Sequence, residues 1–155
     1  MKKIVLEIEV HGKEPEGFLA QVHVAACYVE REDKFLVLER AAGKEVGKWG
    51  VPAGKLEEKE TPEAAALREL FEETGISLER SSQMRSLGSL YIRKPEVDYV
   101  YHMFRVHLDH TPDVRLSDEH QSYTWASARD LEKMPLMAGA VQALEWYRER
   151  RNLQE

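Results

Sequence analysis

The sequence lacks the features that mark secreted, membrane-spanning or nucleic-acid-binding proteins. Cys27 is the only cysteine among 155 residues, so one chain cannot form an internal disulfide, which favours a reducing cytosol. Glu7 and Glu9 interrupt the apolar start of the chain too early for a secretory signal or a membrane span. The formal net charge of −6 argues against binding to a nucleic-acid backbone. These absences favour a cytoplasmic protein that binds neither nucleic acid nor membranes.

The length and composition predict one soluble domain over residues 1–155. Hydrophobic residues make up 43% of the chain and charged residues 32%, and there are no repeats or internal linkers. A chain of this size buries about two-thirds of its unfolded surface. Cys27 lies in the apolar run Val22–Val29, where a buried structural thiol is favoured over a nucleophile.

The hydrophobic pattern predicts strands and helices in alternation. We expect strands at Ile4–Val10, Val22–Val29, Phe35–Arg40, Leu87–Ile92, Val100–Leu108 and Tyr123–Ala126. We expect helices at Pro62–Thr74, from Ser127 to a stop before Pro135, and at Ala138–Arg151, the last with Val141, Leu144 and Tyr147 facing inward. The segments His11–Gly17 and Ala41–Lys48 are expected loops, and the second and third strands form a hairpin. The order predicts an α+β fold, with a mixed sheet covered by helices on both sides.

The helix at Pro62–Thr74 has clear start and stop signals. Thr61 is a hydroxyl N-cap, Pro62 occupies the first helical position, and Gly75 suits a left-handed C-cap. At about 100° per residue, one face of this helix gathers Leu67, Leu70, Phe71 and Thr74. The opposite face gathers Glu69, Glu72 and Glu73.

Three carboxylates on one helix face have two interpretations. The first is an ordinary solvated acidic surface. The second is a metal site, because oxygen ligands in this number suit Mg²⁺, with Mn²⁺ as the alternative. The preceding segment Trp49–Gly54 favours the second, since a tight loop there brings a backbone carbonyl close to the helix. Arg68 could also orient the carboxylate of its neighbour Glu69.

A longer pattern surrounds these carboxylates. It reads G-x5-E-x7-R-E-U-x-E-E-x-G-U, where U is a bulky aliphatic residue, and its accidental occurrence in a chain of this length has a chance of roughly 10⁻⁷. The fixed positions are Gly54, Glu60, Arg68, Glu69, Leu70, Glu72, Glu73, Gly75 and Ile76. This stretch resembles the signature box of the Nudix hydrolases of MutT type, which cleave diphosphate bonds. The resemblance implies an α/β/α sandwich in which the box is a loop, a helix and a second loop.

The resemblance also implies roles for individual residues. The carbonyl of Ala53 would bind metal, together with the carboxylates of Glu69, Glu72 and Glu73. Arg68 would orient Glu69, and Glu60 would play a structural part near the site. The loop departs from the common family form at Ala53 and Lys59, where glycines are usual.

A further acidic residue lies outside the box. Many relatives take a metal ligand or base from a loop glutamate six residues before a tryptophan, and Glu119 and Trp125 have this spacing. Glu119 could also belong to a plain polar turn.

The reaction that the resemblance implies is nucleophilic substitution at phosphorus. Mg²⁺ would neutralise the diphosphate and lower the pKa of the attacking water. We expect Glu72 or Glu69 to take the proton, with Glu119 as an alternative. A glutamine at position 73 should leave the fold intact and lower turnover.

The substrate is less well defined by the sequence. Aromatic residues outside the box could stack on a base, although strand aromatics are mostly core residues. These are Trp49, Tyr91, Tyr99, Tyr101, Phe104 and Tyr123. Arg40 or Arg93 could hold a phosphate, as could Lys44, Lys48 and Lys55, which flank the box. His102, His107 and His120 fit structural or exposed positions.

Three functions remain open at this point. The first is hydrolysis of a nucleoside di- or triphosphate by a monomer or homodimer, which the size and the Pro52–Glu57 stretch favour by resemblance. The second is hydrolysis of ADP-ribose, a nucleotide sugar or a dinucleoside polyphosphate. The third is a catalytically silent nucleotide sensor, although such domains usually lose box glutamates. Removal of messenger-RNA caps would need a basic surface that this acidic chain lacks.

Overall fold

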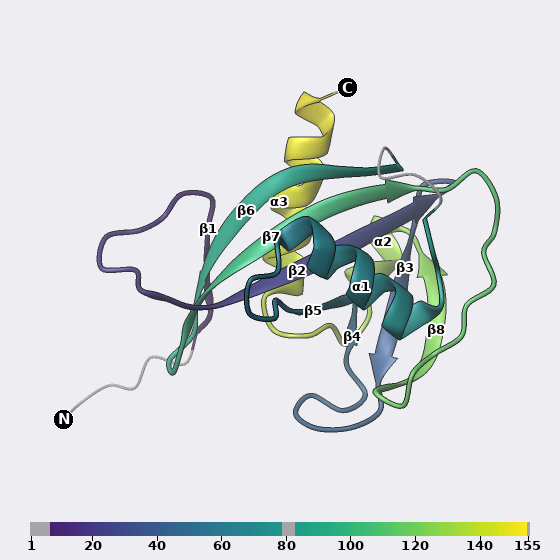
Figure 1. Ribbon diagram of the computed structural model, residues 1–155, viewed down its shortest axis with the longest axis horizontal. Helices are drawn as coiled ribbons and strands as arrows, with labels where there is room; N and C mark the ends of the chain where they lie inside the picture. Colours follow the sequence, from purple (N-terminus) through teal and green to yellow (C-terminus); the bar gives the residue numbers. More distant parts are fainter. Residues whose placement is uncertain (1–6, 79–82, 155) are drawn as a thin grey trace.

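The computed structural model describes residues 7–78 and 83–154, in which eight strands form one sheet between helices (Figure 1). The strands are β1 (Glu9–His11), β2 (Ala20–Arg31), β3 (Lys34–Arg40), β4 (Trp49–Gly50), β5 (Ala53–Lys55), β6 (Met84–Arg93), β7 (Asp98–His107) and β8 (His120–Ala126). The helices are α1 (Pro62–Thr74), α2 (Ala128–Leu131) and α3 (Ala140–Leu153).

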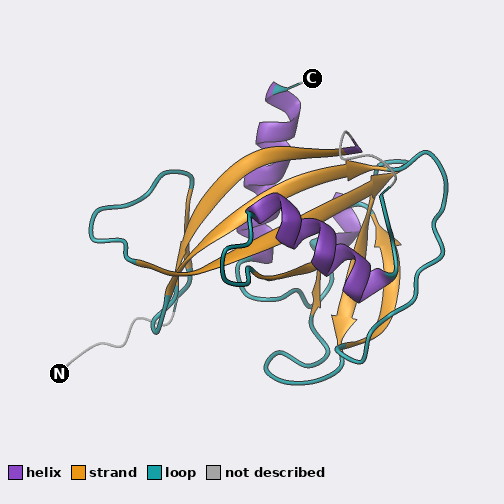
Figure 2. Cartoon of the chain, viewed as in Figure 1, coloured by secondary structure: helices purple, strands orange, loops and turns teal. Residues whose placement is uncertain are grey.

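Strand β2 is the centre of the sheet. It pairs in parallel with β7 and antiparallel with β3 and β5, within the order β1-β6-β7-β2-β3-β4, while β8 pairs with β3. Helix α1 covers one face and α3 the other (Figure 2). The predicted α+β fold, a mixed sheet between helices, is confirmed. No helix in the described residues is both long and apolar enough to cross a membrane.

The alternation of β2 creates two cores. Ala25, Cys27 and Val29 face α1, whereas Ala26 and Tyr28 face α3. All five are buried, so the strand is apolar on both faces, as its sequence predicts. The Cys27 thiol donates to the carbonyl of Ala66 in α1 at 3.4 Å, and burial raises its pKa to about 12. The predicted structural role of this thiol is confirmed.

The strand predictions are confirmed in position, with shifts at their ends. The β2–β3 hairpin turns through Glu32 and Asp33, both of which have positive φ. Two-residue hairpin turns of this kind match the right-handed twist of the strands that they join. At the N-terminus the prediction was partly wrong, because β1 begins at Glu9 and includes His11, which we expected in a loop. Residues 4–6 of the expected strand lie outside the described residues.

The two ends of α1 are as predicted, but one of its faces is not. The Thr61 hydroxyl accepts from the Ala64 N–H at 3.1 Å, and the N–H of Gly75, with φ of 78°, donates to the Phe71 carbonyl at 2.8 Å. Phe71 is 56% exposed, so it does not share the burial of Leu70 and Thr74, with which the helical pattern groups it. The sheet-facing side instead carries Ala65, Ala66, Leu70, Glu73 and Thr74. Phe71 lies about 100° around the helix axis from Leu70, at the margin of this buried side.

Helix α3 starts two residues later than predicted. Gly139 precedes it with a left-handed φ of 84°, and an added Cβ would lie 2.8 Å from the Ile8 Cδ1 atom. Leu144 and Tyr147 are buried as expected, but Val141 is 41% exposed and its inward orientation was wrong. The left-handed break before the helix places Ala143 in the core instead.

Candidate active site

The candidate site begins at the free edge of β5. The N–H of Cys27 donates to the Pro52 carbonyl at 2.8 Å, and the N–H of Leu56 donates to the His23 carbonyl at 2.9 Å. These bonds define the hydrogen-bonded positions of the β2–β5 pair, so the backbone groups of Ala53 between them point away from β2. The Ala53 N–H accordingly donates to Glu73 Oε1 at 3.1 Å. Its carbonyl lies along the same edge, beside the helix.

Glu73 and Glu69 form a close carboxyl pair between α1 and β5. Glu73 is only 4% exposed, and the side chain of Glu69 is 15% exposed. The glycine at position 54 leaves space for the Glu69 carboxylate, because a Cβ there would lie 2.1 Å from that group. Glu69 and Glu73 therefore do not lie on an exposed face of the helix. The solvated-surface interpretation is wrong for these two residues.

Arg68 connects the box loop to the helix. Its Nε and Nη2 donate to the two oxygens of Glu60 at 2.8 and 2.9 Å, in a bidentate pair. Its Nη1 donates to Glu69 at 3.0 Å and to Glu72 at 3.2 Å, and Nη2 also reaches the Lys55 carbonyl at 3.1 Å. Arg68 lowers the pKa of Glu60 to about 2, so that carboxylate stays ionised. Contact between Arg68 and Glu69, expected from their adjacency, is present.

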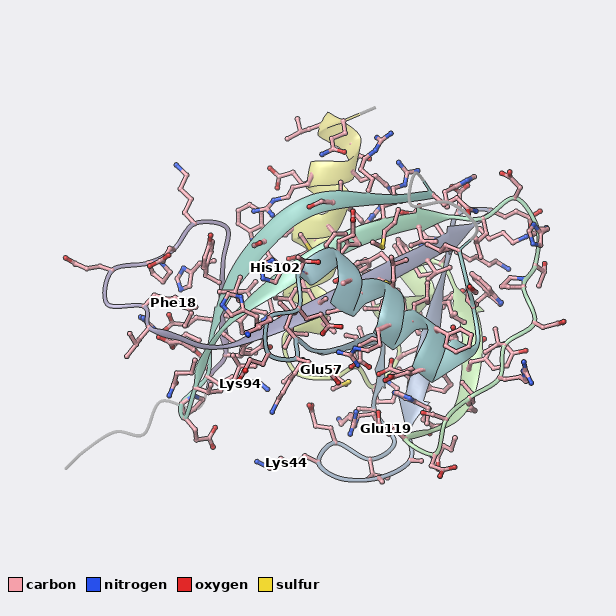
Figure 3. The ribbon with its side chains drawn as sticks, in the orientation of Figure 1. Phe18, Lys44, Glu57, Lys94, His102 and Glu119 are labelled. Atoms are coloured by element: carbon pink, nitrogen blue, oxygen red, sulfur yellow. The ribbon has the colours of Figure 1, made fainter. Side chains whose placement is uncertain are left out.

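Two further carboxylates lie at the margin. The Glu72 side chain is 55% exposed and touches Arg68. Glu119 precedes β8, and its backbone carbonyl accepts from the Ala41 N–H at 2.8 Å, which holds it beside the loop of residues 41–48 (Figure 3). Its charge contributes to the raised pKa of Glu73, so Glu119 lies near enough to the box to affect it electrostatically. Trp125, six residues later, packs against the core on the α1 side.

The electrostatics of the Glu69–Glu73 pair are set by burial and by the neighbouring charges. Burial raises the pKa of Glu73 to about 9, and the charges of Glu69 and then Glu119 add to this. Burial likewise raises the pKa of Glu69, against the lowering effect of Arg68. The donors are oxygen atoms, which suit a hard divalent cation. Within the described residues, however, no three acidic, histidine or cysteine side chains already converge as metal ligands. Arg68 donates to one oxygen of Glu69 and to one oxygen of Glu72, which leaves the second oxygen of each carboxylate clear of Arg68.

A cavity of about 550 Å³ lies on the α3 side of β5, within the size range of small-molecule sites. Ala53, Gly54 and Lys55 form part of its wall, so the cavity adjoins the carboxylates across the free edge of β5. Tyr99 and Tyr101 also line it. The remaining wall comes largely from apolar residues of β2, α3 and the segment 136–140.

The other residues considered for substrate binding lie elsewhere. Arg93 pairs with Asp98 at 3.2 Å, and Arg40 donates to the carbonyls of Ala42 and Lys44 within its own loop. Neither lines the cavity. The Lys44 side chain points outward from the loop (Figure 3). Trp49, Tyr91, Phe104, Tyr123 and Lys48 are also absent from the cavity wall.

The histidines do not line this cavity either. His102 is half-buried, and it bonds to His23 at 3.0 Å and to the Ser89 hydroxyl at 2.9 Å. His107 is exposed, and the pKa of His120 is lowered by burial. Structural or exposed positions were predicted for His102, His107 and His120, and the structure places them so.

The chain matches the NUDIX domain over residues 20–147, and it belongs to the Nudix hydrolase family. The box, the mixed sheet and the flanking helices are thus those of a Nudix pyrophosphohydrolase-type enzyme. It is similar to "Phosphatase NudJ" of Shigella boydii, with 33% identity over 77% of this chain and 80% of the relative. It is 28% identical to the "CTP pyrophosphohydrolase" of Escherichia coli K12, over 82% of this chain and 91% of that protein. Its fold resembles a MutT Nudix hydrolase from Burkholderia pseudomallei, with a TM-score of 0.69, 28% identity and coverage of 81% and 96%.

The sequence did not single out Glu45 or the segment Leu136–Ala140, which all line the cavity. Glu45 and residues 136–139 come from irregular backbone, so no periodicity marks them. The positive φ of Glu45, 62°, is visible only in the structure. Glycines at positions 43 and 47 indicate a turn-rich loop, but they do not reveal which side chain faces inward.

Proposed function

We propose that the protein is a Mg²⁺-dependent hydrolase, formed as one domain over residues 1–155, that cleaves a diphosphate bond in a nucleoside di- or triphosphate. One observation carries the proposal. The Glu69–Glu73 pair, of which Glu73 is buried, lies at the free edge of β5, and the α3 side of that strand borders a cavity large enough for a nucleoside. A substrate crossing this edge would place its diphosphate against the carboxylates and its remaining part in the cavity.

The names of the relatives agree with this substrate class. One is a CTP pyrophosphohydrolase and another a phosphatase. The net charge of −6 gives a free polyphosphate no general attraction to this protein. Recognition of the diphosphate therefore depends on local positive charge at the site.

The donors that would hold the metal are the Ala53 carbonyl and the carboxylates of Glu69, Glu72, Glu73 and Glu119. A bound Mg²⁺ offsets charge on the diphosphate and acidifies a water molecule. Arg68 keeps Glu69 against Gly54 and ties the helix to the box loop through Glu60. Glu72 or Glu69 takes the proton from the attacking water, with Glu119 as the alternative. The Glu72 side chain is more exposed than that of Glu69, so Glu72 can reach a water molecule at the mouth of the site more easily.

A hydrolysis screen tests the proposal. The panel contains nucleoside tri- and diphosphates, ADP-ribose, nucleotide sugars and dinucleoside polyphosphates, with and without Mg²⁺, at slightly alkaline pH. Products are identified by mass, which locates the broken bond. We expect Mg²⁺-dependent release of a nucleotide and a phosphate or pyrophosphate from mononucleotides, and its loss in Glu73→Gln.

Glu63→Gln is the matched control, because Glu63 lies on the same helix but is exposed in its first turn. It should keep wild-type turnover. Activity confined to ADP-ribose or dinucleoside compounds would overturn the proposed substrate. Nucleotide binding without hydrolysis of any compound would indicate a sensor instead of an enzyme.

A further inference from the structure

The cavity beside the box contains few polar side chains. They are Tyr28, Glu45, Lys55, Lys94, Tyr99 and Tyr101. The hydroxyls of Tyr28 and Tyr101 bond to each other at 3.0 Å, and Lys55 belongs to β5, at the diphosphate end. The groups left to recognise the remainder of a substrate are therefore on Glu45, Lys94 and Tyr99.

Glu45 is held in an unusual backbone conformation. Its φ is 62°, in the left-handed region that residues other than glycine rarely adopt. The loop around it is braced by Arg40, whose Nε donates to the Lys44 carbonyl at 3.2 Å. The Lys48 N–H donates to the Glu45 carbonyl at 3.0 Å. The side chain of Glu45 is therefore presented by a constrained turn.

The Glu45 carboxylate also joins two distant parts of the cavity wall. Its Oε1 accepts from the N–H of Ala138, 93 residues away, at 2.9 Å. Both residues line the cavity. Among the described residues, no other hydrogen bond occupies this carboxylate, so its second oxygen can accept from a ligand. An ionised carboxylate accepts hydrogen bonds and cannot donate them.

Tyr99 supplies the complementary group. Burial raises the pKa of Tyr99 to about 12, and the charge of Glu45 adds to this rise, so the hydroxyl keeps its proton at neutral pH. The Lys94 ammonium lies 5.6 Å from the centre of the Tyr99 ring. Figure 3 shows Lys94 on the turn between β6 and β7. The cavity thus presents an obligate acceptor on Glu45 and a hydroxyl donor on Tyr99, within walls that are otherwise mostly apolar.

We propose that Glu45, with Tyr99, makes this cavity selective for a base that carries an amino group beside a ring acceptor, as cytosine and adenine do. The inference rests on the proposed function, because it assigns the base of the same substrate. The amino group donates to the Glu45 carboxylate, and the neighbouring ring nitrogen accepts from Tyr99. Uracil and hypoxanthine present an oxygen where the amino group would be, which places two acceptors against each other.

Two matched substrate pairs test the selectivity, CTP against UTP and ATP against ITP. Within each pair the bases differ at the amino position. We expect kcat/KM to favour the amino member of at least one pair by about tenfold or more. Glu45→Gln should abolish or reverse that preference, because the amide NH2 then faces the base and donates to a carbonyl oxygen instead of accepting from an amino group. This variant keeps an oxygen for the Ala138 N–H, so the loop contact survives.

Glu132→Gln, at an exposed position outside the cavity, is the control and should keep the wild-type ratio. Equal kcat/KM within both pairs, or an unchanged ratio in folded Glu45→Gln, would overturn the inference while leaving the hydrolase proposal intact. If no nucleotide is hydrolysed, the hydrolase proposal fails separately. Binding of CMP against UMP and AMP against IMP then decides the base preference, and equal affinity within both pairs overturns it.

Discussion

Two glutamates buried to the same degree have opposite surroundings in this protein. Glu30, at the end of β2, is 5% exposed, and Glu73 in α1 is 4% exposed. Glu30 accepts from the Tyr147 hydroxyl, pairs with Arg151 at 2.7 Å, and has Arg105 within 3.4 Å. Glu73 has one backbone N–H, and the described residues bring no lysine or arginine into an ion pair with it. The first carboxylate connects α3 to the sheet, whereas the second retains an uncompensated burial cost that a cation can offset.

The largest effect we expect is on turnover when Glu73 is changed. Glu73→Gln should lower kcat by roughly 10²–10⁴-fold, the range associated with lost metal or acid–base catalysis. Without metal, the same variant should unfold at an equal or higher urea concentration, because a buried carboxyl beside Glu69 has been replaced by a neutral amide. Steady-state kinetics and urea unfolding measure the two quantities. A folded variant with wild-type turnover would remove Glu73 from the site.

Changing Glu30 should lower stability and leave turnover unchanged, which is the reverse of the outcome for Glu73→Gln. Glu30→Ala should lower the free energy of unfolding by about 3 kcal/mol, because it leaves Arg151 and Tyr147 without their buried partner. The arginine side chains are about one-fifth exposed, which places the loss at the low end of the usual range. Turnover per folded molecule should stay at the wild-type level below the melting transition. A large loss of turnover in the folded variant would show that this network also serves the site.

Mg²⁺ should distinguish the two glutamates without any measurement of hydrolysis. At a concentration 100 times its Kd, a cation that binds only the folded state stabilises it by about 2.7 kcal/mol. We expect Mg²⁺ to raise the melting temperature of the wild type and of Glu30→Ala through this stabilisation. The melting temperature of Glu73→Gln should not respond to Mg²⁺. Thermal melts at increasing Mg²⁺ give the comparison. The same rise in all three proteins would place the cation elsewhere.

The smallest effect should come from His102, a half-buried group with no opposite charge bonded to it. Burial, and then His23, lower its pKa below the ordinary value of 6.5. The unfolded chain therefore binds this proton more readily, so stability falls as pH drops below about 6.5, until the folded pKa is reached. His102→Gln should flatten this part of the pH–stability curve. Urea unfolding between pH 5 and pH 8, about the range of histidine titration, measures it. An unchanged slope would mean that other groups cause the dependence.

Local signals made much of the fold predictable. The Thr61 cap, Pro62 and Gly75 define α1 to the residue, because each acts on the backbone within a few positions. The hairpin at Glu32 and Asp33 is equally local. The inward orientation of Val141 was wrong, and Phe71 is exposed although the pattern groups it with Leu70, because hydrophobicity alone does not define which side of a helix meets the sheet.

The candidate site was predictable only in part, because some of its features depend on contacts between segments that are distant in sequence. The box residues are specified by spacing, and the structure brings Glu69, Glu73 and Ala53 together. The burial of Glu73 could not be read from the helix pattern, which puts it on the polar side. Glu45 was missed because its position depends on a loop that meets residue 138 only in the folded chain.

The parallel pairing of β2 with β7 has a consequence for how the chain is made. Its register joins Ala20 to Asp98 and Glu30 to His107, so the partners are far apart in sequence and slow to meet. During synthesis, β2 emerges long before β7 and has an open edge until residue 107 has left the ribosome. An apolar strand with an unpaired edge is prone to pair with other chains. Nascent chains that stall between β3 and β7 should therefore be the species most dependent on chaperones.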